Sequence, residues 1–211
     1  MKVIRLSAGQ VLYRVGDCVD KIYFVNQGPV SSARTMEDGR TMEIGAVGIE
    51  GAVGAVALFG FEAAALEYVV SLPTTALYCK TGDLQPEVTR NPRFMTLLQQ
   101  YCYLAMCQIA QISACNGLHK LEQRCCRWLL TAHDSARADH FQLTHEFLAM
   151  TLGVQRASIS LTALTLQQEG YIQYKRGQIT IIERGGLEAT ACECYGTIRR
   201  LFDRLSLQPT K

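Results

Sequence analysis

The amino-acid sequence predicts an α+β architecture made of three consecutive parts. Residues 1–90 consist of short β-branched and aromatic runs between turn residues, which is typical of a small antiparallel β-barrel or jelly roll. Residues 91–117 carry apolar side chains at intervals of three and four, as one long helix would. Residues 118–211 combine helical periodicity, an internal glycine and two alternating runs, which together predict a winged helix-turn-helix.

The runs in residues 1–90 recur at roughly 8–12 residues, a spacing that favours a closed or two-layered β structure. Glu37-Asp38-Gly39 separates two of these runs and indicates a hairpin. Residues 50–60 are rich in small side chains and interrupt the alternation, so a short helix within a loop is expected there.

Asn91 and Pro92 mark the start of the long helix, because asparagine is a favoured N-cap and proline is tolerated in the first turn. The Asn116-Gly117 pair is suited to its end. Arg93 is the only charged side chain between these points. Since so apolar a helix cannot be solvated on all sides, we expect one side to contact the β domain and the other to pair with a second copy of the chain.

Two more helices are expected in the third part, over residues 118–134 and from Gly186 to about Leu205. The inner stripe of the first is predicted to consist of Leu118, Leu121, Cys125, Trp128 and Leu129.

Gly153 interrupts the apolar stretch 143–170 and would cost a continuous helix roughly 1 kcal/mol relative to alanine. Its tolerance of positive φ suits a tight turn between two short helices, the first capped by Thr144 and the second starting near Gln155. Such a pair forms a helix-turn-helix, whose second helix reads base edges with its N-terminal residues. The alternative is two antiparallel helices in an ordinary α+β domain.

The stretch 171–183 reads as a two-stranded hairpin with a basic tip, the wing of a winged helix. Arginine can bond guanine and glutamine can bond adenine, whereas basic side chains on a wing contact phosphate. For His145, a phosphate contact and a solvated surface position both remain open. The predicted DNA-binding residues are Thr144, His145, Gln155, Arg156, Ser158, Lys175 and Arg176.

The chain of 211 residues has a net charge of +2. Residues 1–90 hold 8 basic and 10 acidic side chains and residues 91–211 hold 13 and 9, so the basic excess lies in the C-terminal part. This mild excess alone does not establish nucleic-acid binding. No apolar run approaches the ~20 residues that span a bilayer, and the N-terminus makes a poor signal peptide. We therefore expect a cytoplasmic protein without a membrane partner.

Nine cysteines at irregular spacing do not form a disulfide framework, and we expect them to be reduced. Cys192 and Cys194 are expected on the final helix, where side chains two residues apart point about 200° away from each other and cannot share a metal ion. The four histidines are not at ligand spacing, so no metal or cofactor is predicted. No nucleophile elbow, phosphate-binding glycine loop or His-Glu-x-x-His occurs, so no enzyme activity is predicted.

The order of β domain, long helix and winged helix resembles the Crp/Fnr family of bacterial transcription regulators across essentially the whole chain. The most specific segments are "ACNGLHKLEQRCCRWLL", "LTHEFLAMTLGVQRASIS", "GYIQYKRGQITI" and "GGLEATACECY". The resemblance implies a homodimer held by residues 91–117, with two recognition helices on a near-palindromic operator about one DNA turn apart. RNA polymerase is a further candidate partner, and the β domain is the candidate sensor of a small-molecule effector.

Departures from the family pattern narrow these expectations. Residues 50–70 contain no arginine to hold a cyclic phosphate, so cyclic AMP is not the expected effector, which stays unknown. Some members hold an iron–sulfur cluster with several cysteines in an N-terminal extension, whereas Cys18 is the only cysteine before Cys79 here, so no cluster of that kind is expected. Ala157 and Leu161 stand where many members have Glu and Arg, so a different operator is expected. The alternatives are a constitutive DNA binder, a redox-responsive regulator that uses cysteines, and a signal-binding module whose winged helix contacts protein.

Overall fold

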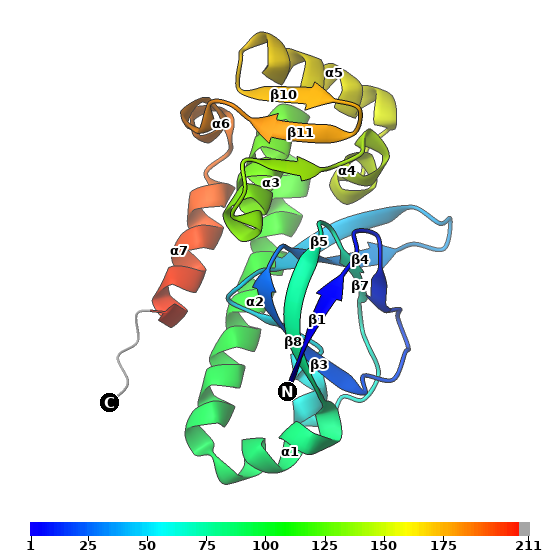
Figure 1. The fold of residues 1–211 in the computed structure, drawn as a ribbon, viewed down its shortest axis with the longest axis vertical. Coiled ribbons are helices and arrows are strands. Elements are labelled where there is room, and N and C mark those ends of the chain that lie inside the picture. Colours follow the sequence, from blue (N-terminus) through cyan, green and yellow to red (C-terminus); the bar gives the residue numbers. More distant parts are fainter. Residues whose placement is uncertain (207–211) are drawn as a thin grey trace.

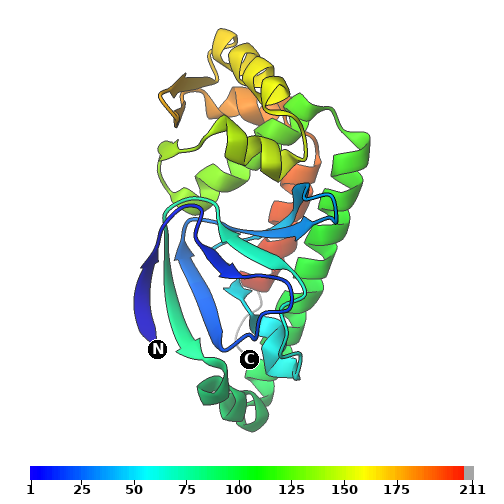
Figure 2. The same ribbon diagram turned by 90° about the vertical axis from the view of Figure 1, so that its right-hand side faces the viewer.

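The computed structural model describes residues 1–206 and contains the three predicted parts (Figure 1). The β domain lies along one side of the long helix α2 (Pro92–Leu118), and the C-terminal domain sits at the far end of α2. Figure 2, turned by 90°, shows the last helix, α7 (Cys194–Ser206), running back beside α2.

The β domain consists of two four-stranded antiparallel sheets, in the orders β1-β8-β3-β6 and β2-β7-β4-β5. Their facing side chains form one core that includes Ile22, Val30, Val53 and Val70, each fully buried. The predicted hairpin joins β4 and β5, and Met36 N donates to Arg40 O (2.9 Å) across its turn. The strand bounds are β1 Lys2–Leu6, β2 Val11–Tyr13, β3 Lys21–Gln27, β4 Val30–Thr35, β5 Thr41–Val47, β6 Ala52–Val53, β7 Glu67–Val70 and β8 Thr74–Lys80.

Two helices belong to this part of the chain. The short helix expected within residues 50–60 is the 3₁₀ helix η1 (Ala55–Phe59). Helix α1 (Thr81–Arg90) was not predicted, since it follows β8 without a break and contains Pro86. Leu84 and Val88 of α1 close the end of the β core.

Helix α2 begins as predicted, with the side chain of Asn91 accepting a hydrogen bond from Phe94 N (3.1 Å) and Pro92 in the first turn. Its 27 residues extend for about 40 Å. One face of α2 is buried against the β domain and the C-terminal helices, through Leu98, Leu104, Gln108, Ile112 and Cys115.

The C-terminal domain packs four helices together with a three-stranded sheet of order β10-β11-β9. The third strand, β9 (His140–Gln142), was not predicted because it lies in a short polar stretch. Leu118, expected in the inner stripe of the following helix, is instead 82% exposed at the end of α2. The other elements are α3 Leu121–Ala136, α4 His145–Leu152, α5 Arg156–Gln168, β10 Ile172–Lys175, β11 Gln178–Ile181 and α6 Arg184–Thr190.

The single final helix predicted from Gly186 is wrong, because α6 and α7 are separate helices. Ala191, between them, has extended backbone (φ −62°, ψ 150°), which lets the chain turn from the C-terminal domain onto α2. Cys192 therefore precedes α7 and Cys194 begins it, so the premise that both lie on one helix is also wrong.

The β domain contacts the C-terminal domain through the end of β3, the turn that follows it, and β5. Gly28 N donates to Ser135 O (2.8 Å) and the side chain of Gln27 donates to Ala136 O (2.9 Å). Trp128 Nε1 donates to the buried carboxylate of Glu43 on β5 (3.2 Å). These bonds fix the C-terminal domain to the β domain through α3.

Over residues 1–206 no individual helix has the length and apolar composition needed to cross a membrane. Helices α4 and α5 meet those criteria only as a pair, and they are bent by 107° at the break between them.

Candidate nucleic-acid interface

Helices α4 and α5 meet in the predicted helix-turn-helix geometry. Thr144 Oγ1 accepts a hydrogen bond from Phe147 N (3.1 Å) and caps α4, as expected. Gly153 follows α4 in the left-handed region (φ 65°, ψ 39°). The angle of 107° between the helices falls in the range of about 90–120° typical of this motif.

Gly153 satisfies a second requirement that the sequence does not reveal. A Cβ at this position would overlap the side chain of Met42, which reaches the turn from β5. The turn of the helix-turn-helix is thus covered by the hairpin of the β domain. Local turn signals predicted the glycine's conformation, but this contact joins segments more than 100 residues apart.

The N-terminal end of α5 carries the predicted base-reading side chains on an open surface. Gln155 is the extended N-cap and is exposed, as is Arg156, whereas Ser158 is half-buried. Arg156 Nε forms an ion pair with Glu146 Oε1 on α4 (2.8 Å), and both side chains are more than 60% exposed. An anionic group that contacts the Arg156 guanidinium from solvent would compete with this carboxylate.

His145 lies between α4, α5 and the wing and is neither solvated nor free. Its Nδ1 is 2.9 Å from Ser160 Oγ, and its ring stacks on Tyr174 with 4.2 Å between centroids. Burial, together with the nearby Arg156 charge, lowers the pKa of His145. Its Nε2 is buried without a hydrogen-bond partner. A phosphate contact through Nε2 would need movement, so the ring's position suits it to holding the wing against α5.

The wing is a tight hairpin, as predicted. Arg176 (φ 51°) and Gly177 (φ 78°) form its two-residue turn, the left-handed pair of a type I′ hairpin. Lys175 and Arg176 are exposed at the tip. Tyr174 N donates to Gln167 Oε1 on α5 (2.9 Å), which fixes the wing beside the recognition helix.

The outer face of α5 holds two large apolar side chains that the site prediction omitted. Leu161 is 68% exposed and Leu164 is 50% exposed, one turn and two turns beyond Ala157. Isolated apolar side chains on a recognition helix can contact thymine methyl groups. Projection of residues 155–168 on a helix would have placed both leucines on the face opposite Ile159.

A cavity of about 200 Å³ lies between the β domain and α2, with Phe202 of α7 also in its lining. Ser32, Tyr68, Tyr101 and Gln108 contribute its polar groups, and Gln108 Oε1 accepts a hydrogen bond from Ala46 N (3.1 Å). Among the described residues that line it, none is charged.

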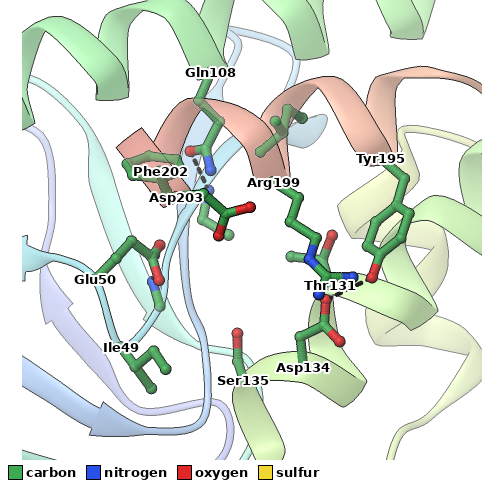
Figure 3. A pocket seen from close by; sticks show the side chains of 13 residues that line it. Ile49, Glu50, Gln108, Thr131, Asp134, Ser135, Tyr195, Arg199, Phe202 and Asp203 are labelled. Carbon is green, nitrogen blue, oxygen red and sulfur yellow. Dashed lines mark hydrogen bonds between the residues drawn. The ribbon is translucent and has the colours of Figure 1, made fainter. Parts of the chain in front are cut away.

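A second cavity, of about 350 Å³, separates the loop after β5 from α3 and α7 (Figure 3). Glu50, Asp134 and Asp203 border it from three different elements, with Arg199 extending toward Asp134 and Tyr195. Burial raises the pKa of Glu50. Within residues 1–206, its lining includes no residue of α5 or of the wing, so this cavity is not part of the candidate interface.

Comparisons with known proteins agree with both halves of this arrangement. Residues 3–90 match the cyclic nucleotide-binding domain family and residues 123–190 match the Crp-like helix-turn-helix domain family. No curated protein sequence matches the chain.

Solved structures share the fold along nearly the whole chain. A CRP-family transcriptional regulator from Thermus thermophilus is 20% identical with a TM-score of 0.72, covering 90% of this chain and 96% of that one. FixK2 from Bradyrhizobium japonicum is 16% identical with a TM-score of 0.74, covering 90% and 97%. The c-di-GMP responsive regulator CLP from Xanthomonas campestris is 16% identical with a TM-score of 0.67, covering 86% and 93%. With both domain families present in this order, the chain belongs to the Crp/Fnr family of DNA-binding transcription regulators.

Proposed function

We propose that the protein is a dimeric, sequence-specific DNA-binding regulator that reads a near-palindromic operator with one α5 helix in each half-site. The observation that carries this proposal is the exposed N-terminus of α5, with Gln155 and Arg156 at the surface beside the basic wing tip of Lys175 and Arg176. Gln155 and Arg156 would contact base edges, which provides sequence specificity. Lys175 and Arg176 would contact phosphates, which provides affinity that depends on salt.

The exposed side of α2 supports the dimer. Its outward residues recur at alternating intervals of four and three, which is the spacing of a coiled-coil seam. Two large apolar side chains on this seam, Tyr103 and Met106, are 61% and 59% exposed in the single chain. A second copy of α2 would bury them. The exposed seam consists of Gln99, Tyr103, Met106, Ala110, Ser113 and Gly117.

The neutral lining of the 200 Å³ cavity argues against cyclic AMP as the effector. A cyclic phosphate buried there would lack a cationic partner and would lose its hydration without compensation. A small uncharged ligand that bonds Tyr68, Tyr101 or Gln108 fits the lining better. Because it acts on DNA, we expect the protein to work in the cytoplasm.

Selection from random double-stranded DNA tests the proposal. We expect one enriched motif with two inverted half-sites about 10 base pairs apart, and affinity that falls steeply as salt rises. A pool with no enriched motif would overturn the assignment, and so would affinity that does not depend on salt.

A further inference from the structure

Four metal-ligating side chains converge where α2 ends and α7 begins. Cys115 lies near the end of α2, His119 follows that helix, Cys192 precedes α7 and Cys194 is its first residue. Their ligand atoms all lie within 4.8 Å of one another. The three cysteines are buried, while the imidazole of His119 is 20% exposed.

Two of the six distances between these atoms match the edges of a tetrahedron around one ion, and all six are at most 4.8 Å. Cys115 Sγ and Cys192 Sγ are 3.5 Å apart, and Cys194 Sγ is 3.6 Å from His119 Nδ1. With zinc–sulfur and zinc–nitrogen bonds of about 2.3 and 2.0 Å, a tetrahedral site has ligand–ligand edges of about 3.5–3.8 Å. The four ligand atoms are therefore close enough for small side-chain adjustments to bring them around a single ion.

Ordinary packing does not explain this cluster. The three buried cysteines form a small cluster of their own, which is separate from the large core of the C-terminal domain. Among the described residues, this cluster consists of Cys115, Cys192 and Cys194. Three thiols and an imidazole bury little apolar area for a structural contact. The chemistry of the donors, rather than their hydrophobicity, is what distinguishes the position.

Two side chains next to the cluster, those of Glu193 and Gln111, contact the ligands His119 and Cys194 and hold them in orientation, as neighbouring groups do in metal sites. His119 Nε2 is 3.3 Å from Glu193 Oε1, so this carboxylate takes the far nitrogen and leaves Nδ1 for the cluster. Gln111 Nε2 donates to Cys194 Sγ (3.0 Å). These contacts form the carboxylate–histidine arrangement typical of zinc ligands.

Two buried arginines on α3 lie close enough to the cluster to act on its charge. Arg124 and Arg127 are 7% and 3% exposed, and the Nε atom of each has no hydrogen-bond partner. Three thiolates, one neutral imidazole and a divalent ion carry a net charge of −1. The positive charges of these two arginines act on the cluster and oppose the negative charge of a bound Cys₃His ion.

We propose that Cys115, His119, Cys192 and Cys194 bind one zinc ion in a closed structural site. Four protein donors leave no open coordination position, which is the pattern of structural rather than catalytic zinc. The ion would fasten the start of α7 to the end of α2, at the junction with α3, so that α7 runs back along α2 as Figure 1 shows. This inference does not depend on DNA binding, because its test contains no DNA.

Elemental analysis of the full-length chain, purified under reducing conditions from zinc-supplemented cells, is the first measurement. We expect about one zinc per chain, and cobalt substitution should give thiolate charge-transfer bands together with the intense d–d bands of tetrahedral cobalt. His119→Ala and Cys194→Ala should each lower zinc affinity at least about ten-fold. The matched control is Cys126→Ala, which removes a buried thiol of α3 outside the cluster and should keep the full zinc content.

Three results would overturn the proposal. The first is a wild-type chain without zinc whose reduced form also fails to take up cobalt. The second is a disulfide between Cys115 and Cys192 in freshly purified protein, which would assign these thiols to redox chemistry. The third is equal zinc content in His119→Ala, Cys194→Ala and wild type. Because the cobalt spectrum is recorded on the wild-type chain, poor folding of a variant does not remove the test.

Discussion

Two features of the structure favour glycine at position 153. Its backbone is left-handed, and the side chain of Met42 from the β domain occupies the space where a Cβ would lie. Any L side chain in this region costs about 1–2 kcal/mol, and the overlap with Met42 adds to that cost. Gly153→Ala should therefore lower the free energy of unfolding by about 2 kcal/mol, as measured by urea denaturation.

The double variant separates the two features. If the contact matters, Gly153→Ala should cost less in a Met42→Ala background than in the wild type, because the overlap is gone. An equal cost in both backgrounds would show that only the turn conformation disfavours alanine.

Glu43 is the buried titratable group that joins the two domains. Burial raises its pKa, while hydrogen bonds from Ser31 and Trp128 and the charge of Arg127 act in the opposite direction and do not cancel the rise. A carboxyl whose pKa is raised by folding stabilises the fold below its unfolded pKa, about 4.3, and loses that contribution as pH rises through the folded pKa.

Glu43→Gln should abolish this loss. Between pH ~4.5 and ~7, the unfolding free energy of the wild type should fall relative to that of the Gln variant. Urea titrations across this range measure the difference, with the exposed Glu37→Gln as control. Parallel profiles for Glu43→Gln and wild type would contradict the raised pKa.

At the scale of elements, the seam on α2 predicts assembly. Met106→Glu should place two carboxylates opposite each other in a dimer and shift the chain to monomer in light scattering after size exclusion. Leu97→Glu is the matched control, since Leu97 is 47% exposed and points away from the seam. A Met106→Glu chain that stays dimeric would place the interface elsewhere.

The sequence predicted correctly those elements whose ends or turns are determined by neighbouring residues. The cap at Asn91, the apolar period of α2 and the glycine after α4 each specify a boundary or a turn from neighbouring residues. They also predicted the positions of Gln155 and Arg156, although the DNA contacts of these residues remain predictions.

The elements that were missed depend on distant contacts. β9 is a strand only because β11 pairs with it, and α1 is a helix despite Pro86 because Leu84 and Val88 fill the end of the β core. The break at Ala191 contains neither glycine nor proline, so no local signal marks it. Because the break at Ala191 was not predicted, the approach of Cys192 and Cys194 to Cys115 was not predicted either.

At the scale of the whole molecule, several separate contacts hold the C-terminal domain, with its helix-turn-helix, against the β domain. The Trp128–Glu43 bond, the Gly28–Ser135 bond and the Met42 side chain over Gly153 all connect β3–β5 to α3 and the helix-turn-helix. A ligand that shifts these strands would therefore shift the population of DNA-competent arrangements, provided that it binds one arrangement more tightly.

Cyclic AMP should not be that ligand. Isothermal titration of the chain with cyclic AMP should give no saturable heat in the micromolar range, because the cavity offers the phosphate no cation. Saturable micromolar binding, accompanied by tighter DNA binding, would contradict the neutral-cavity account.

The most direct test of the central claim compares Arg156→Ala with Arg90→Ala on the operator obtained by selection. Arg156 lies at the start of α5, whereas Arg90 is an exposed arginine on α1 at the opposite end of the molecule (Figure 1). Fluorescence anisotropy at fixed salt should show that Arg156→Ala loses about 1–3 kcal/mol of operator affinity per half-site, while non-specific affinity and unfolding free energy change little. Arg90→Ala should bind like the wild type. Equal operator affinity for Arg156→Ala and wild type would contradict the assignment of α5 as the reading helix.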